Sequence, residues 1–333
     1  MSKDIIILAI ESSCDDTAAS IIKNGKILSN QVATQAIHEQ YGGVVPELAS
    51  RAHQQNIVPV VDIALKEAGI GLNQLSAIAF TKGPGLIGSL MVGSSFAKSL
   101  ALALNIPLIG IHHMQAHVLA HFIDDPKPTF PFLCLTVSGG HTQIVKMTNY
   151  FEQEILGKTI DDAAGEAFDK AAKMLGLPYP GGPLVDQYAQ LGNADAFAFP
   201  NPNIPDLDFS FSGIKTAILY FIRKQELLNP NFIEENLNDL CASIQKTFIK
   251  HLMKKLIKTS DQTDIKQVSL AGGVSANSGL RSAIESEGLK RGWQTFIPAF
   301  QYCTDNAAMI AMAAHYKFLT QSFESIETTP FAR

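Results

Sequence analysis

The order of apolar segments in this chain repeats once, and the repeat constrains the fold more than any single motif. Residues 5–32 read as three antiparallel strands, with Asn24-Gly25 as a two-residue hairpin signal. A helix, a strand, a second helix and another strand follow, ending in the segment 111–117. After a proline-rich stretch at 124–131 the same order begins again, with extra helices inserted. Strands that alternate with helices predict an α/β protein whose mixed sheets are covered by helices.

Composition sets the outer limits. With 333 residues and 46% hydrophobic content, the chain is expected to form two lobes around large cores. Its 4 cysteines are scattered, which excludes a zinc knuckle built from neighbouring residues and is typical of a reducing, cytoplasmic compartment. No signal peptide is visible, and the longest apolar region is interrupted by Lys98, Asn105 and Pro107, so no membrane span is expected. The net charge of -5 indicates that any RNA partner meets a local patch.

A histidine pair lies in the segment that ends the first repeat. His113 and His117 are four residues apart, so on a helix their imidazoles can face one point and bind a single metal ion. The alternative is one solvated histidine and one hydrogen-bonded in a core. Asp305 is a candidate third ligand from the far end of the chain, or else the N-cap of the last helix.

Glycine turns recur where strands end. Ser138-Gly139-Gly140 separates two strands, Pro180-Gly181-Gly182 precedes a helix, and Gly272-Gly273 follows another strand. Glycine lets a backbone approach a phosphate closely, so these turns are candidates for nucleotide binding. A ligand-free hairpin remains the alternative for the first turn, and Asn277 reads as an N-cap or a ligand contact.

Several charged side chains accompany these turns. Glu11, Asp15 and Asp16 crowd the end of the first strand, where local turn hydrogen bonds are the simpler interpretation. Carboxylates beside glycine turns are suited to a ribose diol, and helix capping is the alternative, more so for Asp161 and Asp162 than for Asp169. Four lysines at 246, 250, 254 and 258 form a stripe that is either a solvated helix face or a contact for phosphates.

Together these motifs resemble the TsaD family, the tRNA threonylcarbamoyltransferases once labelled glycoproteases, within the actin-like ATPase (ASKHA) superfamily. The resemblance covers nearly the whole chain, and it departs from the family pattern at Asp16, where Glu is more usual. The motifs that carry it are residues 10–15, 41–51, 83–85, 112–117, 138–142, 161–169, 272–277 and 303–306.

The resemblance implies a two-lobed, ribonuclease H-like α/β fold built from a duplicated βββαβαβα unit, with the ligand in the cleft. We expect an N-terminal lobe at 1–110, joined by the C-terminal helix at about 306–333, and a C-terminal lobe at 111–305. One divalent metal ion, Fe²⁺ in preference to Zn²⁺, is implied at His113, His117 and Asp305. Nucleotide contacts are implied for Thr136, Val137, Ser138, Gly139, Gly140, Asp169, Gly182, Asp186 and Asn277.

The implied reaction transfers a threonylcarbamoyl group from threonylcarbamoyl-AMP to the exocyclic amine of adenosine 37 in tRNAs that read codons starting with A. Glu11 or Asp15 is a candidate to orient that amine or accept its proton. The implied partners are tRNA, a small paralogue of the same fold (TsaB) and a P-loop ATPase (TsaE), with no membrane.

Three other functions remain as alternatives. A metalloprotease of the H-E-x-x-H type needs a glutamate beside its first histidine, and Met114 and Gln115 stand there instead. A kinase or ATPase of the same superfamily would use glycine turns and acids for ATP, but such enzymes hold metal through carboxylates and water. A non-catalytic scaffold that binds nucleotide is the third.

Overall fold

A computed structural model describes residues 4–202 and 204–332. The chain divides into two compact units, unit 1 (Met1–Lys127 with Ala299–Arg333) and unit 2 (Pro128–Pro298). Both crossings between the units lie in proline-bearing stretches, 124–131 and 298–299. Proline is common at such boundaries because it cannot continue a helix or donate to a sheet.

Unit 1 contains a mixed five-stranded sheet in the order β3-β2-β1-β4-β5. Strand β2 pairs antiparallel with β1 and β3, whereas β1, β4 and β5 run parallel. The predicted hairpin turn is confirmed, because Asn24 and Gly25 both have positive φ, 51° and 81°. The strands are β1 (Ile6–Glu11), β2 (Thr17–Lys23), β3 (Lys26–Ala33), β4 (Ala77–Gly83) and β5 (Leu108–His112).

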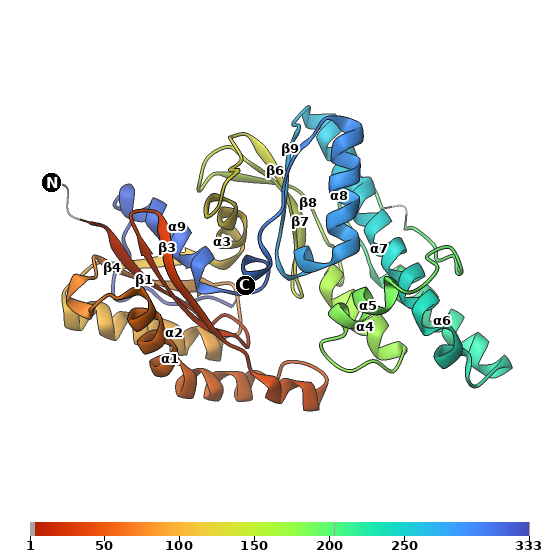
Figure 1. The fold of residues 1–333 in the computed structure, drawn as a ribbon, viewed down its shortest axis with the longest axis horizontal. Helices are drawn as coiled ribbons and strands as arrows, with labels where there is room; N and C mark the ends of the chain where they lie inside the picture. Colours follow the sequence, from red (N-terminus) through yellow and green to blue (C-terminus); the bar gives the residue numbers. More distant parts are fainter. Residues whose placement is uncertain (1–3, 203, 333) are drawn as a thin grey trace. The chain divides into compact units, whose positions relative to one another are not determined.

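Helices cover this sheet on both faces (Figure 1). Helices α1 (Pro46–Ala68) and α2 (Ile87–Leu104) pack on one face, and α9 (Ala307–Leu319) packs on the other, against all five strands. The predicted start of α1 at Pro46 and end before Gly69 are confirmed. Helix α2 is long and apolar enough to cross a membrane by length and composition alone, as core helices of water-soluble folds also are.

The short helix α3 (His113–Leu119) follows β5 directly and packs against α9. This contact brings residues 111–127 into unit 1, whereas the expected boundary near residue 110 placed them in the other lobe. Within the described residues, unit 1 also contains four short 3₁₀ helices: η1 (Ala36–Tyr41), η2 (Leu72–Gln74), η3 (Ala120–Phe122) and η5 (Phe300–Tyr302).

Unit 2 repeats the strand topology of unit 1. Its sheet order is β10-β9-β6-β7-β8, with β7 antiparallel to both neighbours and β6, β9 and β10 parallel. Read from β8, this is the order of unit 1, so the predicted duplication is confirmed. The strands are β6 (Phe132–Val137), β7 (Thr142–Met147), β8 (Gln153–Lys158), β9 (Gln267–Ala271) and β10 (Gln294–Phe296).

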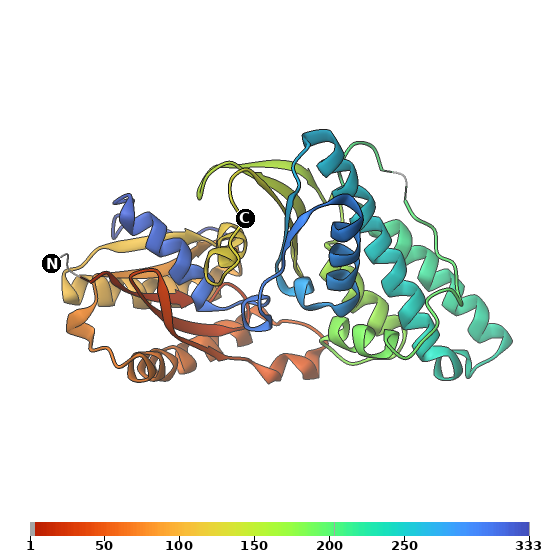
Figure 2. The ribbon, with the colours of Figure 1, turned by 45° about the horizontal axis from the view of Figure 1, so that its top comes forward.

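Unit 2 places a group of helices on one side of its sheet (Figure 2). Four of them stand between β8 and β9, where unit 1 has the single long helix α1, which confirms the predicted helical insertion. Phe168 and Phe248 meet edge to face at 4.8 Å in the core that joins these helices to the sheet. The helices are α4 (Ala164–Met174), α5 (Gly181–Ala189), α6 (Ser212–Leu228), α7 (Phe232–Thr263), α8 (Ser278–Arg291) and the 3₁₀ turn η4 (Gly273–Ala276).

Candidate functional site

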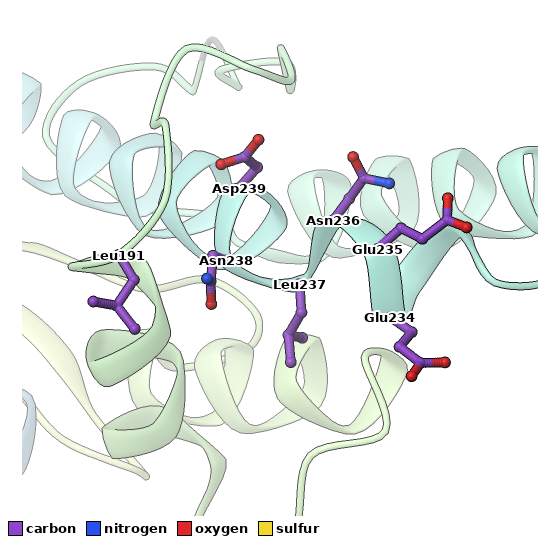
Figure 3. A pocket seen from close by; sticks show the side chains of 7 residues that line it. All are labelled: Leu191, Glu234, Glu235, Asn236, Leu237, Asn238 and Asp239. Carbon is purple, nitrogen blue, oxygen red and sulfur yellow. The ribbon is translucent and has the colours of Figure 1, made fainter.

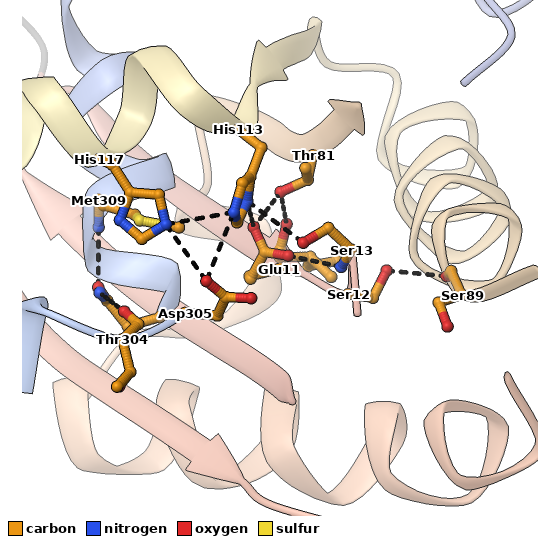
Figure 4. A network of polar contacts seen from close by, with 12 residues as sticks. Glu11, Ser12, Ser13, Thr81, Ser89, His113, His117, Thr304, Asp305 and Met309 are labelled. Atoms are coloured by element: carbon orange, nitrogen blue, oxygen red, sulfur yellow. Dashed lines mark hydrogen bonds and ion pairs between the residues drawn. The ribbon is translucent and has the colours of Figure 1, made fainter. Parts of the chain in front are cut away.

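Three side chains in unit 1 converge on one point. His113 and His117 lie four residues apart on α3, so both imidazoles face the segment before α9, which carries Asp305. The two Nε2 atoms are 3.2 Å apart, and Asp305 Oδ1 lies 3.2 Å from His117 Nε2 and 3.4 Å from His113 Nε2. Figure 4 shows these three groups pointing toward one another. The predicted ligand set is therefore brought together.

The spacing of these atoms fits a single bound ion. Two ligand atoms each about 2.1 Å from a tetrahedral Zn²⁺ stand about 3.4 Å apart, and the three separations here are 3.2, 3.2 and 3.4 Å. Two imidazoles and one carboxylate are also a donor set typical of Zn²⁺ and Fe²⁺. Both histidines are buried. These residues are suited to hold a divalent metal and leave positions open for other ligands.

The other role considered for Asp305 was to cap the last helix. That alternative is wrong, because α9 is capped by the neighbouring residue: Asn306 Oδ1 accepts the N–H of Met309 at 3.0 Å. Asp305 therefore does not cap α9, and its carboxylate faces His113 and His117. Burial alone would raise its pKa, but His113 and His117 outweigh burial and hold the pKa of Asp305 well below its usual range.

The acidic turn after β1 lies beside this site. Glu11 is fully buried and its Oε2 lies 3.2 Å from His113 Nδ1. Asp15 and Asp16 are half-buried. Burial, with the nearby charges of Asp305 and Asp15, raises the pKa of Asp16 to about 7. Glu11 makes the expected local turn hydrogen bond, with the N–H of Ser13, but it also contacts Thr81 on β4 and His113 on α3.

The first glycine turn in unit 2 is packed between two other backbone segments. The N–H of Gly165, at the start of α4, donates to the Ser138 carbonyl at 3.2 Å, and a Cβ at Gly165 would lie 2.7 Å from that oxygen. On the other side, a Cβ at Gly272 would lie 2.5 Å from the Val137 carbonyl, and Gly272 has φ +86°. Glycine is required at both positions. The turns at 138–140 and 272–273 are therefore neighbours.

The second glycine turn is tied to α4 through a carboxylate. Asp169 Oδ1 accepts the N–H groups of both Gly181 and Gly182 at 2.9 Å. Burial raises the pKa of Asp169, although these two bonds favour its charged form. Gly181 and Gly182 are the first two residues of α5, so Asp169 caps the N-terminus of that helix from α4. Helix capping was the alternative role for this residue, although the sequence favoured it less here than for Asp161 and Asp162.

The remaining nucleotide candidates form a cluster at the start of α8. Asn277 caps α8, with Oδ1 accepting the Leu280 N–H at 2.9 Å, as predicted from its position. Asp186, on α5, accepts the N–H and Oγ–H of Ser278 at 2.9 and 2.8 Å. Gln245, on α7, bonds to both, with distances of 3.0 Å to Asp186 and 2.6 Å to Asn277.

The other singled-out carboxylates and lysines bond to neighbours in the same unit. Asp161 accepts the Phe211 N–H at 2.8 Å and two serine hydroxyls at the start of α6, and Asp162 pairs with Lys170 and Lys215. Both therefore have structural partners. In the lysine stripe on α7, Lys246 pairs with Asp195 and Lys258 donates to the Asp206 carbonyl, which favours the solvated-face interpretation for these two.

A pocket of ≈ 280 Å³ in unit 2 contains none of the predicted residues. It lies where α7 is interrupted at Asn236, whose φ of -123° is not helical. Acidic and amide side chains line it together with Leu191 and Leu237 (Figure 3). Asp239 beside it accepts the Asn193 N–H at 2.7 Å. We assign this pocket no function.

Three contributors to the clusters were not singled out from the sequence. Ser13 and Thr81 bond to Glu11, and Gln245 joins Asp186 to Asn277. Ser13 belongs to the motif at residues 10–15, so the sequence indicated the segment although not this side chain. Thr81 lies within the apolar strand β4 and Gln245 lies in the middle of the long helix α7, and neither residue type is unusual in such a place.

Comparison with known proteins gives a consistent result. The family model for TsaD, tRNA N6-adenosine threonylcarbamoyltransferase, matches residues 26–312. A protein of that description from Christiangramia forsetii is 63% identical over 332 residues, covering 99% of this chain and 98% of the relative. Another from Cytophaga hutchinsonii is 58% identical, covering 100% of this chain and 97% of the relative.

Solved structures share the fold at low sequence identity. HypF from T. kodakarensis aligns with a TM-score of 0.64 at 13% identity, over 96% of this chain and 48% of that one. Component A of (R)-2-hydroxyglutaryl-CoA dehydratase from Acidaminococcus fermentans aligns with a TM-score of 0.53 at 18% identity, over 96% and 99%. At these identities the likeness concerns the two-lobed ASKHA-like α/β fold alone, which is the fold class predicted from the sequence.

Proposed function

The chain belongs to the TsaD family, and from that premise we propose how its residues serve the reaction of a tRNA N6-adenosine threonylcarbamoyltransferase. The chain is an enzyme that attaches a threonylcarbamoyl group to the N6 amine of an adenosine in tRNA. The observation that carries this conclusion is identity of about 60% with such enzymes over the full length, with the His-His-Asp set in place. It decides against the kinase, metalloprotease and scaffold alternatives.

The acyl donor we propose is threonylcarbamoyl-AMP, and the acceptor is adenosine 37 in tRNAs that read codons starting with A. The exocyclic amine of adenine is a poor nucleophile because its lone pair is delocalised into the ring. The enzyme therefore has to polarise the carbamoyl carbonyl and stabilise the departing AMP.

We propose Fe²⁺ as the metal held by His113, His117 and Asp305, with Zn²⁺ as the alternative, since imidazole ligands suit both ions. When bound, such an ion supplies Lewis acidity and a fixed point for anionic oxygens. The two histidines are buried and Asp305 is half-buried, and the packing of α3 against α9 holds these donors in place.

The AMP portion of the donor is proposed to bind the glycine turns of unit 2. The backbone of Thr136 and Val137 leads into Ser138, whose N–H donates to the His141 carbonyl at 2.8 Å, and then into Gly139 and Gly140, whose N–H groups are suited to phosphate oxygens. Val137 is fully buried, so any contact from it is made by its backbone. Asp169 holds Gly182 in place, and Asp186 and Asn277 are proposed to face the ribose and base.

Asp15 stays a candidate to orient the amine or accept its proton, since it is half-buried in the acidic turn after β1, whose Glu11 contacts His113. Full transfer by Asp15→Ala, with donor and tRNA both saturating, would remove that role.

The partners we propose are tRNA, a small paralogue of the same fold (TsaB) and a P-loop ATPase (TsaE). The proposed compartment is the cytoplasm, where tRNA is available.

The test is a transfer assay with synthetic threonylcarbamoyl-AMP, an unmodified tRNA transcript and the purified chain, with and without the two partner proteins. Mass spectrometry of the digested nucleosides is expected to show threonylcarbamoyladenosine only when the chain is present. Asp169→Ala and His117→Ala are expected to reduce it strongly. Unmodified adenosine in every sample, with partner activity confirmed separately, would refute the proposal.

A further inference from the structure

We propose that Glu11 is a positioning residue that fixes the orientation and tautomer of His113, so that His113 presents an unprotonated Nε2 to the metal. The inference deepens the proposed function and rests on its metal site. Glu11 was considered above as a group that orients the amine or accepts its proton, and its surroundings favour the positioning role instead.

The carboxylate of Glu11 is enclosed on all sides. Glu11 is the last residue of β1 and is 0% exposed. Its Oε1 accepts the N–H of Ser13 at 2.5 Å, and its Oε2 accepts the hydroxyl of Thr81, on β4, at 2.5 Å. Both oxygens are thus held by neighbours on separate segments of the chain, as Figure 4 shows. A carboxylate with both oxygens engaged inside the protein is poorly placed to shuttle a proton to or from a substrate.

The third partner of this carboxylate is His113. Its Nδ1 lies 3.2 Å from Glu11 Oε2 and 3.2 Å from Ser13 Oγ. An ionised carboxylate can only accept, so His113 Nδ1 must carry the proton that the bond requires. The other ring nitrogen, Nε2, is then the one that lies 3.2 Å from His117 Nε2 and 3.4 Å from Asp305 Oδ1. The bond to Glu11 therefore selects the tautomer that leaves Nε2 available as a ligand.

The two histidines differ in this respect. His117 Nδ1 is buried and has no hydrogen-bond partner among residues 4–202 and 204–332. On the ring nitrogen that faces away from Asp305, His117 therefore has no carboxylate partner, whereas the Nδ1 of His113 has Glu11. A carboxylate behind a metal-bound imidazole fixes its ring and raises its basicity, and losing such a partner typically costs 10–100-fold in metal affinity.

The test measures metal binding and does not depend on activity. The full-length chain is stripped of metal with a chelator and titrated with Co²⁺ and with Zn²⁺, using the visible spectrum of bound Co²⁺ and competition with a chromophoric chelator. Glu11→Gln is the key variant. Its amide NH₂ group must face either the Ser13 N–H or His113 Nδ1, which both donate to Glu11, so one of these two hydrogen bonds is lost. We expect affinity to fall about 10–100-fold and the Co²⁺ spectrum to change. Glu324→Gln, which alters an ion pair with Lys82 elsewhere in unit 1, is the matched control and is expected to bind like wild type.

A double-mutant comparison separates positioning from a general structural effect. If Glu11 acts through His113, then Glu11→Gln added to His113→Ala lowers affinity no further. An equal loss in both backgrounds would overturn the inference. Wild-type affinity in Glu11→Gln, with affinity lost in His117→Ala, would overturn it too while leaving the metal site intact. If Glu11→Gln does not fold, Thr81→Val decides: it removes one donor to the carboxylate without changing shape, and wild-type metal affinity in it would refute the proposal. A chain that binds metal as described but transfers no threonylcarbamoyl group would refute the proposed function alone.

Discussion

Replacing Asp169 with alanine is expected to destabilise unit 2 by about 2–4 kcal/mol. Asp169 Oδ1 is the acceptor for the N–H groups of Gly181 and Gly182, each at 2.9 Å. Gly181 is buried, so its N–H has no access to water and loses a full hydrogen bond, at a cost of about 1–3 kcal/mol. Gly182 is only partly buried, and water can replace part of its loss, so we assign it about 1 kcal/mol.

The assay is equilibrium unfolding in urea, followed by circular dichroism, with hydrogen exchange of the 179–185 segment measured by mass spectrometry. Asp169→Asn is the matched control, because its amide oxygen can accept the same two N–H groups. It is expected to stay within about 1 kcal/mol of wild type. Unfolding of Asp169→Ala at the wild-type urea concentration, or an equal loss in Asp169→Asn, would refute the reasoning that backbone N–H satisfaction is what Asp169 provides.

Three further predictions follow from the same structure. His117→Ala is expected to lose metal affinity by more than the roughly 10–100-fold typical of a second-sphere change, as measured by elemental analysis after dialysis, whereas His315→Ala is expected to keep its metal. Gly272→Ala places a Cβ 2.5 Å from the Val137 carbonyl oxygen at φ +86° and is expected to lower the free energy of unfolding by about 2–4 kcal/mol. Gly273→Ala is the control and is expected to change stability little, because its Cβ meets no atom within 4 Å. Thermal unfolding compares the two variants. Burial raises the pKa of Asp16 to about 7, so the contribution of this one group to the stability of the apo-protein falls as pH rises from about 4 through 7. Asp16→Asn is therefore expected to be more stable than wild type by about 1–3 kcal/mol at pH 8, with the difference shrinking toward pH 5. A difference that does not change with pH would contradict this.

Local signals in the sequence were enough to predict most of the framework. Asn24-Gly25 defined the first hairpin, Pro46 and Gly69 bounded α1, and the proline-rich stretch at 124–131 contains the crossing between units. These features succeed because turn and cap residues act through their own backbone conformation, which depends little on distant contacts. The duplicated strand order then followed from counting elements.

The site was predictable only as far as residue types reveal their chemistry. His113 and His117 stood out through their spacing, and Asp305 stood out as an acid near a helix start. Whether Asp305 or Asn306 caps α9 is a choice between adjacent residues, and it depends on φ and ψ values that composition does not determine.

Long-range partners were beyond the reach of sequence reasoning. Glu11 meets Thr81 and His113 across 70 and 102 residues, and Gln245 meets Asp186 across 59. Such pairs arise from strand register and helix packing, so they become visible only when the sheets are assembled.

The division of unit 1 into two separate stretches has a consequence for synthesis on the ribosome. Residues 128–298 form unit 2 from one continuous stretch, so that unit can fold as soon as it has emerged. Unit 1 must wait, because α9 and Asp305 come from its second stretch, and α9 packs against all five strands of its sheet. The three candidate metal ligands therefore come together only after residue 305 has been synthesised, and His113 and His117 stand without Asp305 while unit 2 is being made. Binding of an ion by all three side chains therefore requires that unit 2 has been synthesised first.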